Sequence, residues 1–391
     1  MAEKSDWPSI LSAFLIGVAG AVQVGRIAPV ATLIQSELAL DLFAIGWLVS
    51  LITAASAVLG LAAGYRVVQT GLRRSLIIGA LIMGASALIS VAITSVPVLI
   101  GARIFEGIGY LVVVVAAPTL IARDAAPKHL AFALALWGTF FTLGLSVAAF
   151  AGGALAEPIG WRGWFIVSAG LILLATLLAL MAIPKDTPET SAATTIRDTL
   201  TDIPESAWLL GAAFLGVTLL ALSILSLLPT FLVQEHGLTP GRAGGITGGV
   251  ALASIAGSLC YGLLAHRIPE GVIAALAALA LVATAFPTFA DSATPERIIP
   301  FAAAAVFMSG ILVAQTFAAV PRVAGAPRLI GPSNGLVAQI GSVGALTGPP
   351  IIGALIAAVG WTAVPTVAAA FAATFVLLYL LALRASPEET P

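Results

Sequence analysis

The stretch LIGARIFEGIGYLVVVV, residues 99–115, is apolar almost throughout, yet it contains two charged residues, Arg103 and Glu106. A helix that crosses a bilayer needs about 20 consecutive apolar residues, and the apolar run continues on the C-terminal side of this stretch. Because Arg103 and Glu106 stand at positions i and i+3, they share one face of such a helix. The stretch therefore predicts a membrane helix that holds an ion pair inside the bilayer.

The composition of the whole chain agrees with this prediction. Of the 391 residues, 60% are hydrophobic and 9% are charged, whereas soluble domains contain about 25% charged residues. We therefore expect an all-α polytopic protein in a lipid bilayer. The net charge of −1 gives no indication of a nucleic-acid surface, and a single cysteine, Cys260, cannot form a disulfide within the chain.

Apolar runs predict twelve transmembrane helices, at 9–36, 43–65, 75–94, 97–122, 130–156, 163–183, 208–233, 243–265, 271–289, 298–321, 333–358 and 362–383. Of the 17 Lys and Arg, twelve fall outside the membrane on one side, three on the other and two inside spans. Because cytoplasmic loops carry the excess of Lys and Arg, we expect both termini in the cytoplasm and the protein in the cell inner membrane.

A long polar connection, 185–206, follows the sixth span and predicts a cytoplasmic linker between two six-helix bundles, 1–184 and 207–391. The halves resemble each other. Four residues recur 200 positions later, namely Gly144, Gly153, Gly160 and Trp161, as Gly344, Gly353, Gly360 and Trp361. Many secondary transporters are built from such repeats, with a substrate site near the midplane between them.

Twelve spans, a central linker and two pseudo-symmetric halves resemble the major facilitator superfamily over essentially the whole chain. The connection between spans two and three is similar to the family pattern G-x-L-x-D-R-x-G-R-R, although Val68 and Gln69 replace its Asp and first Arg. The resemblance implies a loop that controls conformational switching. Its matching positions are Gly64, Gly71 and Arg73, with Gly262 and Arg267 in the second half.

The fourth span carries a second motif of the family, a membrane Arg followed by a glycine pair. Here the matching residues are Arg103, Glu106, Gly107 and Gly109. In the phrases RIFEGIGYL and ALWGTFF, the chain is also similar to cyanate-permease-like members. The resemblance implies a transporter that works by alternating access, and we expect no enzyme activity, no cofactor and a monomer.

Three charges fall clearly inside the expected spans. At 1.5 Å per residue, Arg26 and Glu106 lie roughly 4 Å from the membrane midplane and Arg103 roughly 9 Å, all on the outer side. With one carboxylate for two guanidinium groups, this cluster carries one excess positive charge, which attracts an anion in a low-dielectric cavity. A guanidinium group suits carboxylates and other planar oxyanions because of its forked donors.

We therefore predict that Arg26 contacts an anionic substrate. The alternatives are a structural arginine that binds the backbone carbonyls of a broken helix, or an arginine whose side chain extends to the membrane surface. Arg103 and Glu106 are predicted to set the charge of the cavity. Two interpretations of this pair stay open: a structural ion pair, or a coupling element in which Glu106 takes up a proton.

Further polar residues inside the spans are candidates for the neutral part of a substrate site: Gln23, Tyr110, Gln315, Gln339 and Asn334. For each of the polar candidates in the second half, a helix-to-helix hydrogen bond is the competing interpretation. Tryptophans at the span ends, including Trp161, Trp164 and Trp361, are expected to anchor the protein at the membrane interface. No residue pattern indicates a metal site.

The leading hypothesis is a secondary transporter or facilitator of a small organic or inorganic anion, with protons as a candidate coupling ion. A first alternative is an exporter of lipophilic drugs on the same fold. A second alternative is a membrane sensor that binds a ligand without transporting it. A membrane enzyme is disfavoured because the sequence contains no recognisable nucleophile–base pair or metal cluster.

Overall fold

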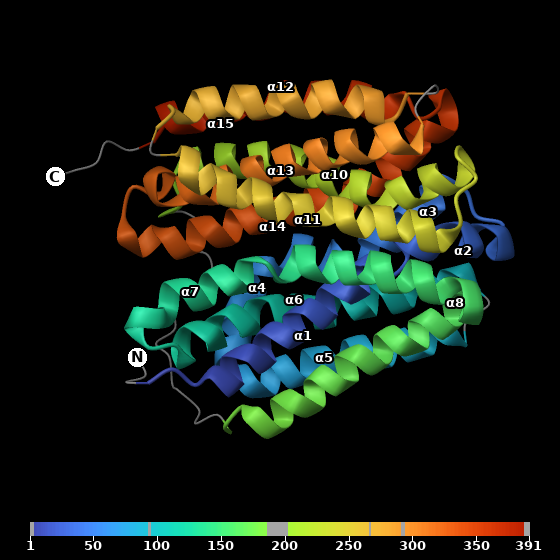
Figure 1. Cartoon of the computed structure of the whole chain (residues 1–391). Helices are drawn as coiled ribbons and strands as arrows, with labels where there is room; N and C mark the ends of the chain where they lie inside the picture. Colours follow the sequence, from blue (N-terminus) through green and yellow to red (C-terminus); the bar gives the residue numbers. More distant parts are fainter. Residues whose placement is uncertain (1–3, 93–94, 186–201, 266, 291–293, 387–391) are drawn as a thin grey trace. The chain divides into compact units, whose positions relative to one another are not determined.

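The computed structural model describes residues 4–92, 95–185, 202–265, 267–290 and 294–386. The regular elements are all helices (Figure 1). In chain order they are α1 (Trp7–Gly25), η1 (Ala28–Val30), α2 (Ala31–Leu38), α3 (Leu42–Ser50), η2 (Leu51–Thr53), α4 (Ala54–Thr70), α5 (Leu72–Val91), α6 (Val96–Asp124), α7 (Pro127–Gly138), α8 (Phe140–Ala182), α10 (Glu205–Gln234), α11 (Pro240–Leu264), α12 (Glu270–Thr288), α13 (Pro295–Ala324), α14 (Pro327–Val359) and α15 (Ala363–Arg384).

Within the described residues, 11 helical stretches are long and apolar enough to cross a membrane. One of them, Pro127–Ala182, contains 56 residues and covers two of the predicted spans. The chain kinks inside this stretch at Gly160, whose φ of 68° and ψ of 175° are not helical. The predicted fold class, an all-α polytopic protein with twelve membrane helices, is therefore confirmed.

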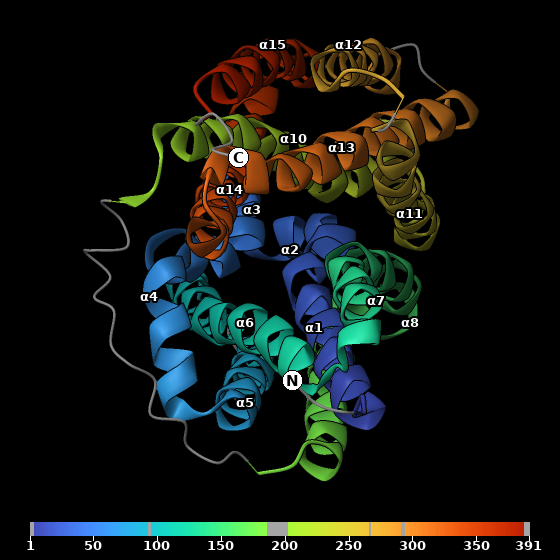
Figure 2. The same ribbon diagram turned by 90° about the vertical axis from the view of Figure 1, so that its left-hand side faces the viewer.

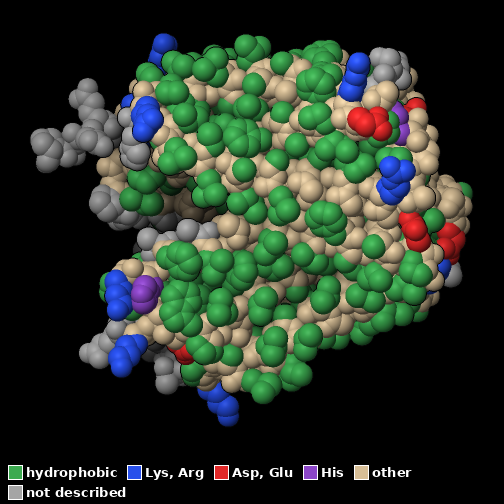
Figure 3. Space-filling view, viewed as in Figure 1, with side chains coloured by type: hydrophobic (Ala, Val, Ile, Leu, Met, Phe, Trp, Pro, Cys, Tyr) green, Lys and Arg blue, Asp and Glu red, His purple; other side chains and the backbone are tan. Residues whose placement is uncertain are grey.

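The surface agrees with a membrane location. On the face shown in Figure 3, apolar side chains are spread over the whole middle, and charged side chains gather near the two ends of the helices. Large apolar side chains such as Val58, Leu259 and Leu279 are more than 60% exposed. Exposed apolar side chains are unfavourable in water but favourable in contact with lipid.

Two predicted spans are interrupted. The first, 9–36, breaks after Gly25: a turn at Arg26 and Ile27 leads into the 3₁₀ helix η1 and then into α2. Pro29 lies in this segment and cannot donate a backbone hydrogen bond. The second, 43–65, is interrupted by η2, which contains neither Gly nor Pro.

The predicted switch loop is mostly helix. Because α4 continues to Thr70, the stretch from Gly64 onward is helical rather than a loop, and Gly71 alone makes the turn into α5 with a φ of 94°. The surroundings of Gly64 are outside the described residues. Nη2 of Arg73 donates to the carbonyl of Leu180 in α8, at 2.9 Å.

The second copy of this motif, in the second half of the chain, is also partly helical. Gly262 lies inside α11, and a Cβ added there would meet no atom within 4 Å. Arg267 is exposed in the turn that follows α11. No contact in the described part of the chain gives Gly262 a packing role.

The packing of the helices divides the chain into two compact units. Unit 1 comprises Met1–Ala39, Leu51–Ala193 and Pro240–Gly248, and unit 2 comprises Leu40–Ser50, Thr194–Thr239 and Gly249–Pro391. These units differ from the predicted halves at two places. Residues 40–50, predicted in the first half, group with unit 2, and residues 240–248, predicted in the second half, group with unit 1. Most of the predicted linker 185–206 is outside the described residues.

A matching hydrogen bond occurs in both units. In unit 1, Nε1 of Trp161 donates to Glu37 at 2.7 Å, and in unit 2, Nε1 of Trp361 donates to Glu235 at 3.0 Å. Both indoles are buried, 3% and 7% exposed, so they tie helix ends together instead of lying free at the membrane interface as predicted. The internal repeat seen in the sequence is therefore also present in the structure, as the same Trp–Glu hydrogen bond in each unit.

The glycines before these tryptophans should resist substitution. Gly160 (φ 68°, ψ 175°) and Gly360 (φ 83°, ψ −178°) occupy a region that side chains with a Cβ rarely adopt. We expect Gly160→Ala and Gly360→Ala each to lower the free energy of unfolding by about 1–3 kcal/mol. Thermal unfolding in detergent measures this loss. Gly170→Ala, in a helical and open part of α8, is the control and should leave the melting temperature nearly unchanged.

Candidate functional site

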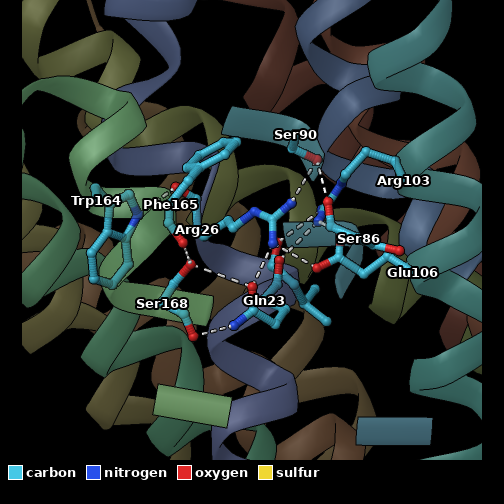
Figure 4. Close-up of polar contacts among 10 residues, drawn as sticks. Gln23, Arg26, Ser86, Ser90, Arg103, Glu106, Trp164, Phe165 and Ser168 are labelled. Carbon is cyan, nitrogen blue, oxygen red and sulfur yellow. Dashed lines mark hydrogen bonds and ion pairs between the residues drawn. The ribbon is translucent and has the colours of Figure 1, made fainter. Parts of the chain in front are cut away.

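The predicted charges converge inside unit 1, where α6 packs against α1, α4 and α5 (Figure 2). α1 brings Gln23 and ends just before Arg26, and α6 brings Arg103 and Glu106. Figure 4 shows Arg26 at the centre of the cluster, with the two α6 residues on one side. The side chains of all three charged residues are 0% exposed.

Glu106 is shared between the two arginines. Nη1 of Arg26 donates to Oε1 of Glu106 at 2.7 Å, and Nη1 of Arg103 donates to Oε2 at 2.8 Å. Each carboxylate oxygen therefore has its own guanidinium partner. With Glu106 ionised, the buried triad of Arg26, Glu106 and Arg103 carries one excess positive charge, as the sequence predicted.

Arg103 also binds the broken end of α1. Its Nη1 donates to the carbonyl of Gln23 at 2.9 Å, and its Nη2 donates to the carbonyl of Val24 at 3.4 Å. The last carbonyls of a helix have no partner within the helix and carry the negative end of its dipole. Arg103 thus stabilises the end of α1 at the point where the first span breaks.

Arg26 has four further contacts. Its Nη1 donates to Oε1 of Gln23 at 2.5 Å, and its Nη2 lies 3.5 Å from Oγ of Ser90. Its guanidinium carbon lies 4.5 Å from the centre of the Phe165 ring, a cation–π contact. Its backbone carbonyl accepts a hydrogen bond from Nε1 of Trp164 at 2.9 Å. Nε of Arg26 is buried and has no acceptor within the described part of the chain.

The side of the cluster away from α6 is formed by α8, which sequence reasoning missed. Nε2 of Gln23 donates to the carbonyl of Ser168 at 2.7 Å, while Trp164 and Phe165 surround Arg26. Trp164, predicted as an interface anchor, is 0% exposed. A signal was available, because Trp164 and Ser168 are four residues apart and share one helix face.

Two serines of α5 complete the surroundings. Oγ of Ser90 donates to the carbonyl of Ser86 at 2.7 Å. Oγ of Ser86 is buried and has no hydrogen-bond partner among the described residues. Neither serine was among the predicted site residues, because small polar residues recur along many membrane helices and carry no charge to mark them.

The other predicted contact residues lie apart from the triad. Tyr110 is 7% exposed, and a Cβ added to Gly20 of α1 would lie 3.8 Å from its ring. Gln315 is fully buried in unit 2, and its Nε2 donates to the carbonyl of Glu270 at the start of α12, at 2.6 Å. Gln339 is half-buried and Asn334 is exposed, both in α14.

These placements separate the predicted contacts into two sets. Gln23 joins the triad directly, and Tyr110 belongs to the same unit, whereas Gln315, Gln339 and Asn334 belong to unit 2. Among the described residues, no group of three or more His, Cys, Asp or Glu side chains is arranged to hold a metal ion.

A family model described as the Major Facilitator Superfamily matches residues 10–328. The chain belongs to the major facilitator superfamily. It is similar in fold to a crystal structure of a bacterial homologue of the human lysosomal transporter Spinster, inward-facing and unoccupied. The TM-score is 0.78 at 16% identity, covering 99% of this chain and 96% of that one.

Curated relatives in this superfamily match part of the chain. The galactose-proton symporter of Escherichia coli K12 is 27% identical over 171 residues, 44% of this chain and 36% of the symporter. The multidrug resistance protein B homolog of Mycobacterium tuberculosis is 30% identical over 129 residues, 33% of this chain and 24% of that protein. The chain thus spans about a third of the length of the curated relatives it matches, or less.

Removing the shared carboxylate should destabilise this superfamily member strongly. Glu106→Gln leaves two buried guanidinium groups without an anionic partner, and breaking a buried ion pair in this way costs about 3–5 kcal/mol. The matched control is Glu37→Gln, which removes the exposed ion pair between Glu37 and Arg162. Thermal unfolding in detergent should show a much larger loss for Glu106→Gln. Equal losses for the two variants would contradict a central role of Glu106 in stability.

Proposed function

We propose that the protein is a secondary transporter that moves a small anion, an organic carboxylate or an inorganic oxyanion, across the cell inner membrane by alternating access. The observation that carries this proposal is the buried triad, in which two arginines share one carboxylate. Family membership supports the transport mechanism. A gradient would drive transport, since the sequence contains no ATP-binding motif.

The electrostatics of the triad favour an anion. One excess positive charge in a water-free site is costly unless a negative charge approaches it. The end of α1 compensates part of the charge of Arg103 through the carbonyls of Gln23 and Val24. Arg26 keeps one donor, Nε, that finds no acceptor among the residues that the structure describes. Arg26 is therefore the group that we propose meets the substrate.

In this structure Arg26 is fully buried, so the proposal requires a second state in which its guanidinium group is accessible. An incoming carboxylate would replace Glu106 as the partner of Arg26, because both present the same pair of oxygens. Glu106 would then bind Arg103 alone or take up a proton. This exchange would couple the anion to a proton, in keeping with the name of the galactose-proton symporter.

A second candidate function is an exporter of lipophilic drugs. It is favoured by the names of several relatives, among them the multidrug efflux pump LfrA of Mycolicibacterium smegmatis, 28% identical over 142 residues, 36% of this chain and 28% of that protein. In this case Glu106 would attract a cationic drug, and Arg26 would be structural. The similarity to cyanate-permease-like members favours the anion instead and stays a prediction.

A ligand screen separates the two candidates. Ligands that bind the folded state raise its melting temperature by mass action. We expect small carboxylates or inorganic oxyanions to stabilise the wild type and not Arg26→Gln. Arg26→Lys keeps the positive charge but loses the forked pair of donors, so the same anions should raise its melting temperature only weakly. The control is Arg162→Gln, since Arg162 also has an ion pair and a cation–π contact, with Glu37 and Trp161.

The outcome of the screen assigns the function. Stabilisation of wild type and Arg162→Gln by the same anion, without stabilisation of Arg26→Gln, supports the anion transporter. Stabilisation by lipophilic cations alone, or by anions in all variants equally, contradicts it and makes the drug exporter the better candidate. Uptake into proteoliposomes of the anion found in the screen then tests transport itself.

The proposed proton coupling predicts a split between two assays of Glu106→Gln. Because Gln cannot be protonated, accumulation driven by a pH gradient should fall to background. Exchange of labelled for unlabelled substrate across the membrane, which needs no net proton movement, should continue. Loss of both activities in a variant that still folds would instead indicate that Glu106 positions the arginines and does not carry the proton.

A further inference from the structure

A guanidinium group has two edges on which a pair of oxygens can be bound, one formed by Nη1 and Nη2 and one formed by Nε and Nη2. In Arg26, Nη1 is fully used, since it donates to Oε1 of Gln23 at 2.5 Å and to Oε1 of Glu106 at 2.7 Å. The other oxygen of Glu106 binds Arg103 at 2.8 Å. Glu106 therefore contacts Arg26 through a single oxygen and is not its forked partner.

The edge of Arg26 formed by Nε and Nη2 keeps its donors. Nε is buried and meets no acceptor in the part of the chain that the structure describes. Nη2 lies 3.5 Å from Oγ of Ser90 (Figure 4), longer than the limit of about 3.2 Å for an ordinary hydrogen bond. Oγ of Ser90 gives its own hydrogen to the carbonyl of Ser86. A buried pair of donors without a close acceptor is unfavourable until an acceptor arrives.

The surrounding residues of α8 hold this edge in a fixed orientation. The ring of Phe165 covers the guanidinium group at 4.5 Å, and Nε1 of Trp164 binds the backbone carbonyl of Arg26 at 2.9 Å. Gln23, which accepts from Nη1, is itself bound to the carbonyl of Ser168 at 2.7 Å. A guanidinium group that is already fixed loses little conformational freedom when its second edge binds a ligand. Arg26 is thus preorganised to bind two coplanar oxygens.

The charge of the triad limits the charge of such a ligand. With Glu106 ionised, one monoanion makes the group of three side chains and ligand neutral. A dianion would leave one excess negative charge in surroundings that water does not reach, and an uncompensated buried charge is costly. The carbonyls of Gln23 and Val24 already supply negative partial charge at Arg103, which adds to this cost.

We propose that the edge of Arg26 formed by Nε and Nη2 is the substrate subsite, and that the substrate is a monovalent oxyanion with two coplanar oxygens, such as a monocarboxylate. This inference rests on the anion transport proposed above and adds how the anion is held and how many charges it carries. The anion binds this edge while Glu106 still occupies Nη1. The exchange with Glu106 follows from that complex.

Oxamate and oxalate test the charge of the ligand. The two ions have nearly the same size and present the same carboxylate, but oxalate has a second carboxylate where oxamate has a neutral amide. We expect oxamate to bind the wild-type protein at least about tenfold more tightly than oxalate, because only oxamate makes the site neutral. Isothermal titration calorimetry in detergent at neutral pH measures both affinities. Equal affinities, or tighter binding of oxalate, overturn the assignment of a monoanion.

NMR of the arginine side chains tests the edge itself. Protein labelled with nitrogen-15 at arginine Nε, in lipid nanodiscs, gives a separate signal for each Nε–H group, and Arg26→Lys identifies the signal of Arg26. Formate, the smallest carboxylate, should move this proton signal downfield, because Nε gains an acceptor. The control is Arg162, which also has a carboxylate partner and a ring contact, and whose Nε already donates to the carbonyl of Val91 at 3.2 Å. Its signal should not move.

Phe165→Leu covers the case that Arg26→Lys does not fold, because loss of the ring also shifts the Nε signal of Arg26 and so identifies it. A downfield shift at Arg26 and not at Arg162 supports the subsite. Stabilisation of the protein by formate without a shift at Arg26 overturns the subsite and leaves anion transport standing. If no anion of the ligand screen stabilises the protein, the subsite and the proposed anion transport are both wrong.

Discussion

Glu106 is the constraint on which unit 1 depends. Its two oxygens hold two guanidinium groups from different helices, at 2.7 and 2.8 Å, in a site that water does not reach. Neither arginine is stable there without it. Since Arg103 also binds carbonyls of α1, the single carboxylate determines how α1 and α6 lie against each other and where the first span bends.

The comparison of the two units explains the bend. Pro29 of the broken first span and Pro229 are related by the offset of 200 residues, yet α10 passes through Pro229 without interruption. Proline alone is thus not sufficient to break the helix. Unit 1 differs because a buried arginine is available to bind the carbonyls that the break releases. At the matching place in unit 2, Val306 replaces Arg103, and its side chain has no hydrogen-bond donor.

Sequence reasoning predicted the elements and the meeting of the charges, since apolar length determines a span and the rise per residue determines depth. It did not predict which helix faces turn toward the cluster. In a span that is apolar all round, periodicity does not mark the packed face, so the positions of Trp164, Ser168 and Ser90 were missed. For the same reason, depth alone did not reveal the bond of Gln315 to the start of α12.

The shared carboxylate also bears on how the chain enters the membrane during synthesis. Arg103 can pair with Glu106 as soon as their own helix forms, but Arg26 waits for a partner that lies 80 residues later. At about 5–20 residues per second, the ribosome needs several seconds for that interval. During this time the first span holds Arg26 without its carboxylate partner, at a cost of about 2.5–3.5 kcal/mol. The strongly apolar remainder of α1 offsets that cost, so its hydrophobicity serves insertion as well as packing.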